Sequence, residues 1–155
     1  MGSHLLSKSS FIRGVQCEKH LYLYKYHYKE MDQLSDMQKA IFKRGTNVGK
    51  LAQQLFPNGI DASPDSQFEY DKAALLTKKL IEEKQKVIYE ASFSFSDVLA
   101  VADILVNDKS GLKVYEVKSS TSISETYIND ISVQYYVMSD AGLPISDISI
   151  IYIYI

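Results

Sequence analysis

The stretch ADILVNDKSGLKVYEVKSS, residues 102–120, decides how the rest of this chain can fold. An apolar run interrupted by Asp103 leads into a polar turn that ends in Gly111, and a second run ends in Glu116 and Lys118. This pattern is typical of two β-strands joined by a turn. Side chains two residues apart on a strand point to the same face, so Glu116 and Lys118 are expected to be neighbours, with Asp103 across from them.

Two carboxylates and an ammonium on an otherwise apolar sheet need an explanation. Charges are costly to bury unless they pair with one another or hold a metal ion. The sequence therefore indicates a charged site at the end of this strand pair. Two alternatives stay open: Glu116 and Lys118 form a same-face ion pair on an exposed sheet edge, which contributes little, or Asp103 caps the turn.

The periodicity of the flanking segments predicts an α/β fold. Three consecutive strands favour an antiparallel meander, and a helix before the last strand favours a crossover to a parallel neighbour. The expected fold is therefore a mixed β-sheet flanked by helices. Helices are predicted at 11–24, 37–56, 68–86 and 128–141, strands at 87–95, 98–106, 112–118 and 148–155, a turn at 107–111, and polar connections at 61–66 and 119–126.

The segment that begins at Phe11 carries two conflicting signals. Loose helical spacing favours a helix capped by Ser9 or Ser10, whereas tyrosines at every second position from Tyr22 to Tyr28 favour a strand. We expect a helix here. Mixed with lysine and histidine, these tyrosines form either a stacking and phosphate-contact surface for nucleic acid or ordinary packing at a domain edge.

The length of 155 residues suits one domain with its own core. That domain is expected over residues 5–155, with Met1-Gly-Ser-His4 as a cloning remnant. No apolar run is long enough to span a bilayer, so no membrane association is expected. The single cysteine, Cys17, excludes an internal disulfide and favours a reducing cytoplasm, and we expect it to be a small buried hydrophobic residue.

The net charge of −2 is unevenly distributed. Residues 1–50 carry nine Lys and Arg against four Asp and Glu, a net charge of +5, and the remainder carries eight against fifteen, a net charge of −7. A basic N-terminal third is able to meet a polyanion while the acidic remainder holds a metal ion. The alternative is that the two signs are simply mixed over the surface. The basic candidates for contacts to nucleic acid are Lys8, Arg13, Lys25 and Arg44.

The acids and their neighbours resemble a known superfamily. Glu90, then Asp103, then Glu116-Val117-Lys118, then Gln134 with Tyr136 nearby, resembles the PD-(D/E)XK nucleases, and among them the RecB-like branch that includes CRISPR-adaptation exonucleases. The N-terminal run Leu6-Ser-Lys-Ser-Ser10, with Cys17 and Leu21-Tyr22 after it, is similar to the first helix of that branch. The resemblance covers most of the chain and implies a restriction-endonuclease-like core.

The chemistry that follows is metal-dependent hydrolysis of a phosphodiester bond. Carboxylate oxygens hold Mg²⁺ or Mn²⁺, so Asp103 and Glu116 are the expected ligands, with the carbonyl of Val117 as a third and Glu90 at a second metal or a water. Lys118, with a lowered pKa, is expected to position or deprotonate the attacking water or to stabilise the phosphate charge.

The helix residues and the substrate are implied by the resemblance. Gln134 would orient a ligand or contact the DNA backbone, with Tyr136 beside it. The substrate would be DNA, and the products would carry 5′-phosphate and 3′-hydroxyl ends.

The chain also departs from that branch at two places. Gly49 follows an Arg-Gly pair where a histidine ligand is expected, and His20 or His27 would have to replace it. An iron–sulfur cluster is not expected, because Cys17 has no companion cysteines. The bare apolar C-terminal strand invites pairing with another chain, either a second copy or a larger parent chain. A nuclease-like module that only binds nucleic acid, and an interaction domain that pairs through this strand, therefore remain alternatives to a nuclease.

Overall fold

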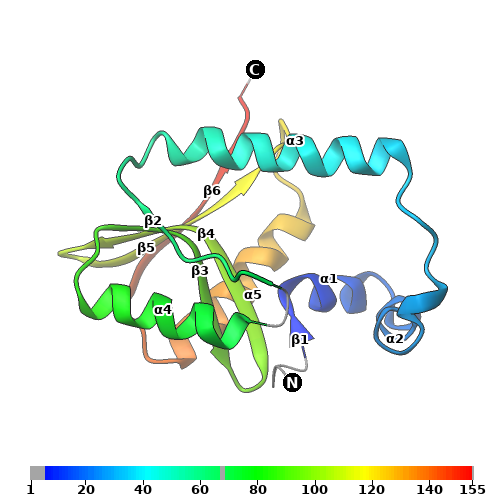
Figure 1. The fold of residues 1–155 in the computed structure, drawn as a ribbon, viewed down its shortest axis with the longest axis horizontal. Helices are drawn as coiled ribbons and strands as arrows, with labels where there is room; N and C mark the ends of the chain where they lie inside the picture. The colour runs from blue at the N-terminus through cyan, green and yellow to red at the C-terminus, as the bar shows by residue number, and fades with distance from the viewer. Residues whose placement is uncertain (1–5, 67–68, 155) are drawn as a thin grey trace.

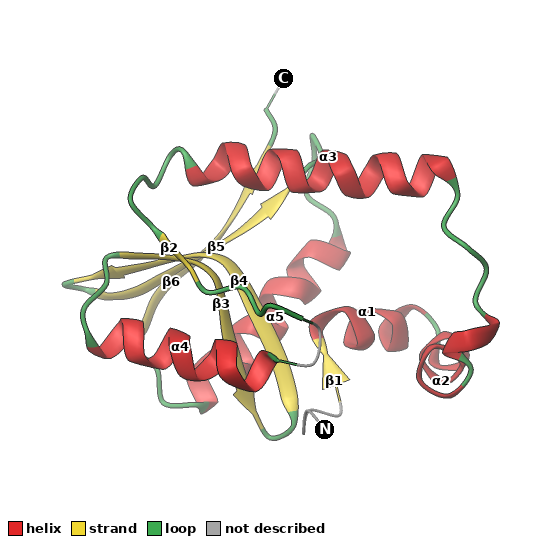
Figure 2. Cartoon of the chain, in the orientation of Figure 1, coloured by secondary structure: helices red, strands yellow, loops and turns green. Residues whose placement is uncertain are grey.

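The computed structural model describes residues 6–66 and 69–154. Helices predominate in its first half, and the longest strands lie in the second half (Figures 1 and 2). In chain order the elements are β1 (Leu6–Ser7), α1 (Lys8–Gln16), α2 (Glu18–Tyr26), the short 3-10 helix η1 (Tyr28–Glu30), α3 (Asp36–Gln53), β2 (Ile60–Asp61), α4 (Tyr70–Glu82), β3 (Val87–Phe95), β4 (Val98–Asp108), β5 (Gly111–Lys118), α5 (Glu125–Asp140) and β6 (Ile145–Tyr152).

The described strands form one mixed sheet in the order β2-β3-β4-β5-β6, with β1 paired to the start of β4. The strands β3, β4 and β5 run antiparallel, and β6 returns parallel to β5 after the α5 crossover. Gly111 opens β5 with a φ of +123°, a conformation that L side chains rarely adopt, and a Cβ there would lie 2.5 Å from the carbonyl oxygen of Pro144. The predicted α/β fold with a mixed sheet is confirmed.

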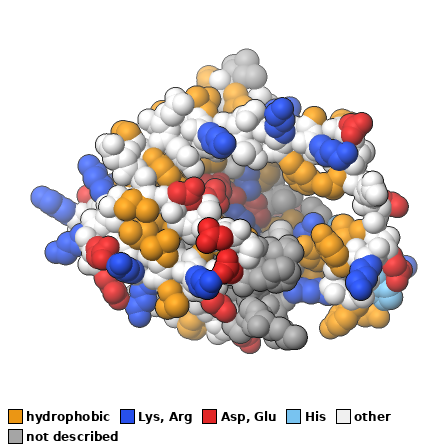
Figure 3. All heavy atoms as spheres, in the orientation of Figure 1, with side chains coloured by type: hydrophobic (Ala, Val, Ile, Leu, Met, Phe, Trp, Pro, Cys, Tyr) orange, Lys and Arg blue, Asp and Glu red, His pale blue; other side chains and the backbone are white. Residues whose placement is uncertain are grey.

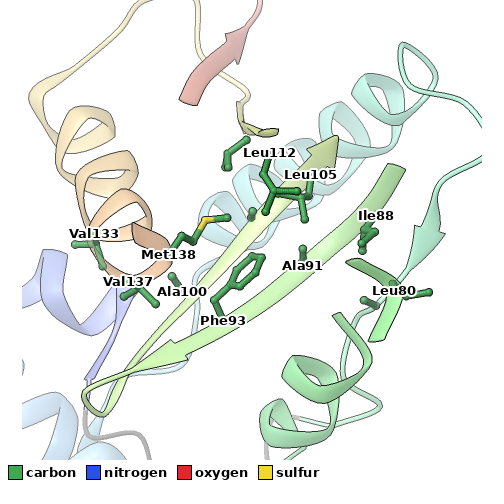
Figure 4. Close-up of a cluster of buried hydrophobic side chains, with 13 residues drawn as sticks. Leu80, Ile88, Ala91, Phe93, Ala100, Leu105, Leu112, Val133, Val137 and Met138 are labelled. Carbon is green, nitrogen blue, oxygen red and sulfur yellow. The ribbon is translucent and has the colours of Figure 1, made fainter. Parts of the chain in front are cut away.

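Helices cover both faces of the sheet (Figure 1). Helices α4 and α5 pack on one face over the larger core, where Leu80 of α4 and Met138 of α5 meet apolar side chains of β3, β4 and β5 (Figure 4). Helix α3 lies across the other face, above a smaller core that contains Ala52 and Ile104. Burial of these apolar surfaces is the main stabilising contribution to the fold.

Near the centre of the sheet, the side chains of β4 stop alternating regularly between the two faces. Alternation would place Ala102 with Ile104 on the α3 side, yet Ala102 packs in the larger core on the opposite side. The change coincides with Glu90, whose φ of +52° interrupts the pleat of β3 opposite this point. A non-glycine residue in this conformation stores about 1–3 kcal/mol of strain. The acidic residues of the candidate site therefore lie where the strands are irregular.

The N-terminal segment forms two helices instead of the single helix predicted. The chain breaks at Cys17, which is extended with a φ of −168° and separates α1 from α2. Ser7 caps α1 by accepting a hydrogen bond from the backbone of Ser10, so the prediction of Ser9 or Ser10 as the cap was wrong. The prediction that Cys17 is buried was also wrong, because its side chain is exposed at this break.

Several element boundaries differ from the predicted ones. The strand 87–95 is β3 as predicted, whereas α3 begins behind a capping box of Ser35 and Gln38 and ends three residues early. Within the predicted loop 61–66, Asp61 belongs to β2, and the predicted starting residue Phe68 of α4 lies outside the described residues.

The last two elements also begin earlier than predicted. Helix α5 begins inside the predicted connection 119–126, and β6 begins at Ile145 and ends at Tyr152. The expected cloning remnant 1–4 and the last residue, Ile155, lie outside the described residues. None of the helices in the described ranges is long and apolar enough to cross a membrane.

Candidate active site

Three carboxylates lie in a row across three neighbouring strands. Glu90 lies opposite Asp103 by interpolation between the β3–β4 pairs on either side, and the β4–β5 register, continued by one pair, places Asp103 opposite Glu116. Directly opposite side chains on paired strands have Cβ atoms about 5 Å apart. Like charges at that spacing repel one another, so the row is electrostatically unfavourable unless cations compensate it.

Glu116 is the most buried of the three acids, with 3% of its surface exposed. Its Oε1 atom accepts hydrogen bonds from the ammonium groups of Lys8 and Lys118, each at 2.7 Å. Its Oε2 atom accepts a hydrogen bond from Gln134 of α5. Burial opposes the charge of this carboxylate, but the two lysines outweigh burial and hold the pKa of Glu116 below its usual value.

Lys118 has a second carboxylate partner, Asp130 of α5. Its ammonium also lies 5.0 Å from the centre of the Tyr127 ring, over the ring face. Burial works to lower the pKa of Lys118, but the carboxylates of Glu116 and Asp130 outweigh it and raise the pKa. The two anionic partners of the ammonium account for this direction. The lowered pKa expected for Lys118 beside a bound metal cation stays a prediction.

Asp103 and Glu90 have no such ammonium partner among the described residues. The Oδ2 atom of Asp103 accepts a hydrogen bond of 2.6 Å from the backbone N–H of Val117. Burial, followed by the negative charge of Glu116, raises the pKa of Asp103 to about 6. Burial and the charge of Asp103 raise the pKa of Glu90 to about 7. Both acids are thus held close to protonation at neutral pH.

Gln134 links the helix to the row. Its side chain is fully buried, and its Nε2 atom donates to Glu116 and, at 3.2 Å, to the carbonyl oxygen of Val101. Its Oε1 atom is buried and accepts no hydrogen bond from the described residues. A buried oxygen without a donor costs about 1–3 kcal/mol, so this position suits an added donor such as a water molecule.

The row opens into a pocket of about 720 Å³ below α3. One wall is α3, including Gly45 and Gly49, and the floor holds the three acids of the row together with Lys118. Asp61 and Lys50 also line the pocket. In the space-filling view, acidic side chains gather on this face below α3 (Figure 3). The predicted acids and lysine therefore share one solvent-accessible site.

Tyr136 is the predicted catalytic residue that the structure does not bring into this site. Gln134 and Tyr136 are two positions apart on α5, and residues at that spacing do not share a helix face. The Tyr136 ring lies 6.4 Å from the ring of Phe95, centre to centre, and is half exposed. It is not among the residues that line the pocket.

Of the four basic residues predicted to contact nucleic acid, the structure brings one into the site. Lys8 enters the site through Glu116. Arg13 lies over the ring of Tyr24 at 4.1 Å, and Lys25 and Arg44 are exposed on α2 and α3.

The two histidines proposed as replacement ligands lie elsewhere. His20 is exposed on α2, and His27 bonds to Glu30 through Nδ1 at 2.9 Å. Neither lines the pocket, whereas Gly49, the position where a histidine was expected, does. The pocket therefore lacks an imidazole at that place.

Sequence reasoning missed Asp130 and Tyr127. Asp130 lies four residues before Gln134, and this spacing puts both side chains on one face of α5. An acid one turn from the expected glutamine was the available signal. Tyr127, one turn earlier still, lines the pocket from α5.

The residues fit a hard divalent cation in their chemistry. Mg²⁺ and Mn²⁺ prefer oxygen ligands, and carboxylates of Glu90, Asp103 and Glu116 line the pocket. No three Asp, Glu, His or Cys side chains in ranges 6–66 and 69–154 are gathered as a ready metal site. Glu116 bonds to two lysines and Gln134, and Asp103 accepts a backbone N–H, so these acids bond to protein groups.

Comparison with known proteins found no match to this chain among family models, curated proteins or solved structures.

Proposed function

We propose that this protein is a metal-dependent nuclease that hydrolyses DNA phosphodiester bonds and leaves 5′-phosphate and 3′-hydroxyl ends. The observation that carries the proposal is the row of Glu90, Asp103 and Glu116 on three adjacent strands, with Lys118 beside it in one pocket. The resemblance of these residues to the PD-(D/E)XK nucleases of the RecB-like branch supports the same reaction.

The charge balance supports a dication. Around Glu116 there are four carboxylates, of Glu90, Asp103, Glu116 and Asp130, and two ammonium groups, of Lys8 and Lys118. Asp61 and Lys50, which also line the pocket, contribute one charge of each sign. Full ionisation therefore leaves two uncompensated negative charges, which equal the charge of one Mg²⁺ or Mn²⁺ ion.

Each residue then has a defined task. Asp103, Glu116 and the carbonyl of Val117 would hold the ion, with Glu90 beside them. When bound, the ion would act as a Lewis acid toward the phosphate and would make a water molecule more acidic. Lys118, whose ammonium stays protonated between two carboxylates, donates hydrogen bonds to the attacking water or to the phosphate and stabilises developing negative charge. Gln134 fixes the orientation of Glu116 from the α5 side.

The test is degradation of end-labelled single- and double-stranded DNA with Mn²⁺, Mg²⁺ or EDTA. The wild-type protein is expected to cut with Mn²⁺ or Mg²⁺ and not with EDTA. Lys118→Ala is expected to reduce the rate at least about 100-fold, the usual loss when one stabilising donor is removed. The matched control is Lys113→Ala, because Lys113 lies on the same strand and pairs with Asp108 outside the pocket.

Two results would contradict the proposal. Cleavage that survives in Lys118→Ala places the activity elsewhere or in a contaminant. DNA binding without cleavage under any metal favours the second candidate, a nuclease-like module that only binds nucleic acid. The observation that favours this candidate is that Glu116 already bonds to two lysines and Gln134.

A third candidate is an interaction domain that pairs through β6. This strand ends the order β2-β3-β4-β5-β6 in the described sheet and pairs with β5 along one side. An edge strand is a template for another strand. Association that depends on protein concentration, together with no affinity for DNA, would favour it over the nuclease.

A further inference from the structure

Lys8 reaches the candidate site from the far end of the chain. It is the first residue of α1, and its ammonium bonds to Glu116, which is 108 residues later in the sequence. The preceding strand β1 pairs in parallel with β4, and Ser7 caps α1, so the backbone on both sides of this lysine is fixed. The contact is therefore built into the fold.

One oxygen atom receives both ammonium groups. Lys8 and Lys118 each donate to Oε1 of Glu116, while Oε2 accepts from Gln134. A carboxylate oxygen accepts about two hydrogen bonds, so Oε1 has no position left for another cation. A metal ion that binds Oε1 must displace one of the two lysines.

Lys8 is the lysine that is easier to displace. Lys118 keeps a second carboxylate, Asp130, when it loses Glu116, whereas Lys8 forms no other ion pair within the described residues. Lys8 also places its positive charge at the N-terminus of a helix, where the helix dipole disfavours cations.

The charge of Lys8 compensates the row in part. Its ammonium bonds to Glu116, the acid that the β4–β5 register places opposite Asp103. This is the electrostatic role that a bound cation has in a cluster of acids.

We infer that Lys8 occupies the place of a metal ion against Glu116 in the metal-free protein, and that metal binding displaces its ammonium onto a phosphate of the bound DNA. The inference rests on the proposed function, and it gives one residue two opposite effects. Lys8 competes with the metal ion when DNA is absent, and it contributes a phosphate contact when metal and DNA are both present.

The test uses Lys8→Met, which keeps most of the apolar stem and removes the charge. The first measurement is calorimetric titration of the DNA-free protein with Mn²⁺. We expect Lys8→Met to bind Mn²⁺ about tenfold more tightly, because the ion no longer has to break the hydrogen bond between Lys8 and Glu116. One charge-assisted hydrogen bond is worth at least that factor in affinity. Lys113→Met, which breaks an ion pair outside the pocket, is expected to leave Mn²⁺ affinity unchanged.

The second measurement is the salt dependence of oligonucleotide binding by fluorescence anisotropy, with Ca²⁺ and with EDTA. With Ca²⁺, Lys8→Met is expected to make the negative slope of log K against log salt shallower by about one, the value for one lost phosphate contact. With EDTA, the slope is expected to be the same in both proteins, because Lys8 is then bonded to Glu116. Lys8→Arg is expected to restore the slope measured with Ca²⁺.

The outcomes separate this inference from the proposed function. Equal or weaker Mn²⁺ affinity in Lys8→Met, with Mn²⁺ bound by both proteins, overturns the inference and makes Lys8 a structural partner of Glu116. Lys8→Gln, which keeps a neutral donor to Glu116, provides the same comparison if Lys8→Met does not fold. If wild-type protein binds no metal ion, the proposed function fails and this inference fails with it.

Discussion

Replacing Glu90 by glutamine should stabilise the metal-free protein at neutral and alkaline pH. In the folded state the pKa of Glu90 is raised from 4.5 to about 7, first by burial and then by the charge of Asp103. The folded protein therefore binds this proton more tightly than the unfolded chain does. The stability that depends on the proton is complete below pH 4.5 and is lost as the pH rises to about 7.

The size of the effect follows from the two pKa values. A difference of this size corresponds to about 3 kcal/mol, at about 1.4 kcal/mol for each tenfold change in proton affinity. Glutamine keeps the shape of the side chain and carries no charge, so Glu90→Gln should recover most of this energy at pH 8. At pH 5 the gain should fall below about 1 kcal/mol, since the wild-type side chain is then largely protonated in the folded state.

The assay is thermal unfolding in EDTA at pH 5 and pH 8, for wild type, Glu90→Gln and Glu82→Gln. Glu82 is an exposed acid at the end of α4 and serves as the control for the loss of one charge. A gain of about 3 kcal/mol should raise the midpoint of Glu90→Gln by roughly 6–12 °C at pH 8. Equal or lower stability of Glu90→Gln at pH 8 would refute the reasoning, as would an equal gain for Glu82→Gln.

Three further changes test the surroundings of the row. Asp130→Asn should slow cleavage about 10–100-fold with little change in Mn²⁺ affinity, because Lys118 loses one charged partner, and single-turnover kinetics beside calorimetry would measure both. Gly49→His should tighten Mn²⁺ binding about tenfold relative to Gly49→Ala in the same titration, since Gly49 lines the pocket and an added Cβ there meets nothing within 4 Å. Thr77→Val should cost about 1–3 kcal/mol in urea unfolding, because the buried Thr77 hydroxyl oxygen is the acceptor for the backbone N–H of Ser92.

The strands and the row of acids were predictable because their signals are local. Alternating apolar residues define β3, and a turn that ends in Gly111 fixes which residues of β4 and β5 face each other. Once this register is set, Asp103 and Glu116 must be opposite each other. The spacing of side chains along a strand then places Lys118 on the same face as Glu116.

The partners of these acids were not predictable in the same way. The contact between Lys8 and Glu116 joins residues 108 positions apart, and no periodicity in the sequence encodes it. The break at Cys17 carries neither glycine nor proline, and the nearby Gly14 lies within α1, so the segment looked like one helix. The position of Tyr136 was predictable in principle, since helix geometry turns it away from the face that carries Gln134.

Three unfavourable features coincide in the row, and a stabilising role does not account for any of them. Glu90 has a left-handed backbone inside a strand, the acids repel one another, and the Oε1 atom of Gln134 is buried without a donor among the described residues. Apolar residues at these positions would remove the repulsion. Residues with unfavourable backbone conformation, charge and hydrogen bonding are expected to occur together where function requires them. A dication would relieve the repulsion, while the strain at Glu90 would remain as the cost of holding its carboxylate beside Asp103.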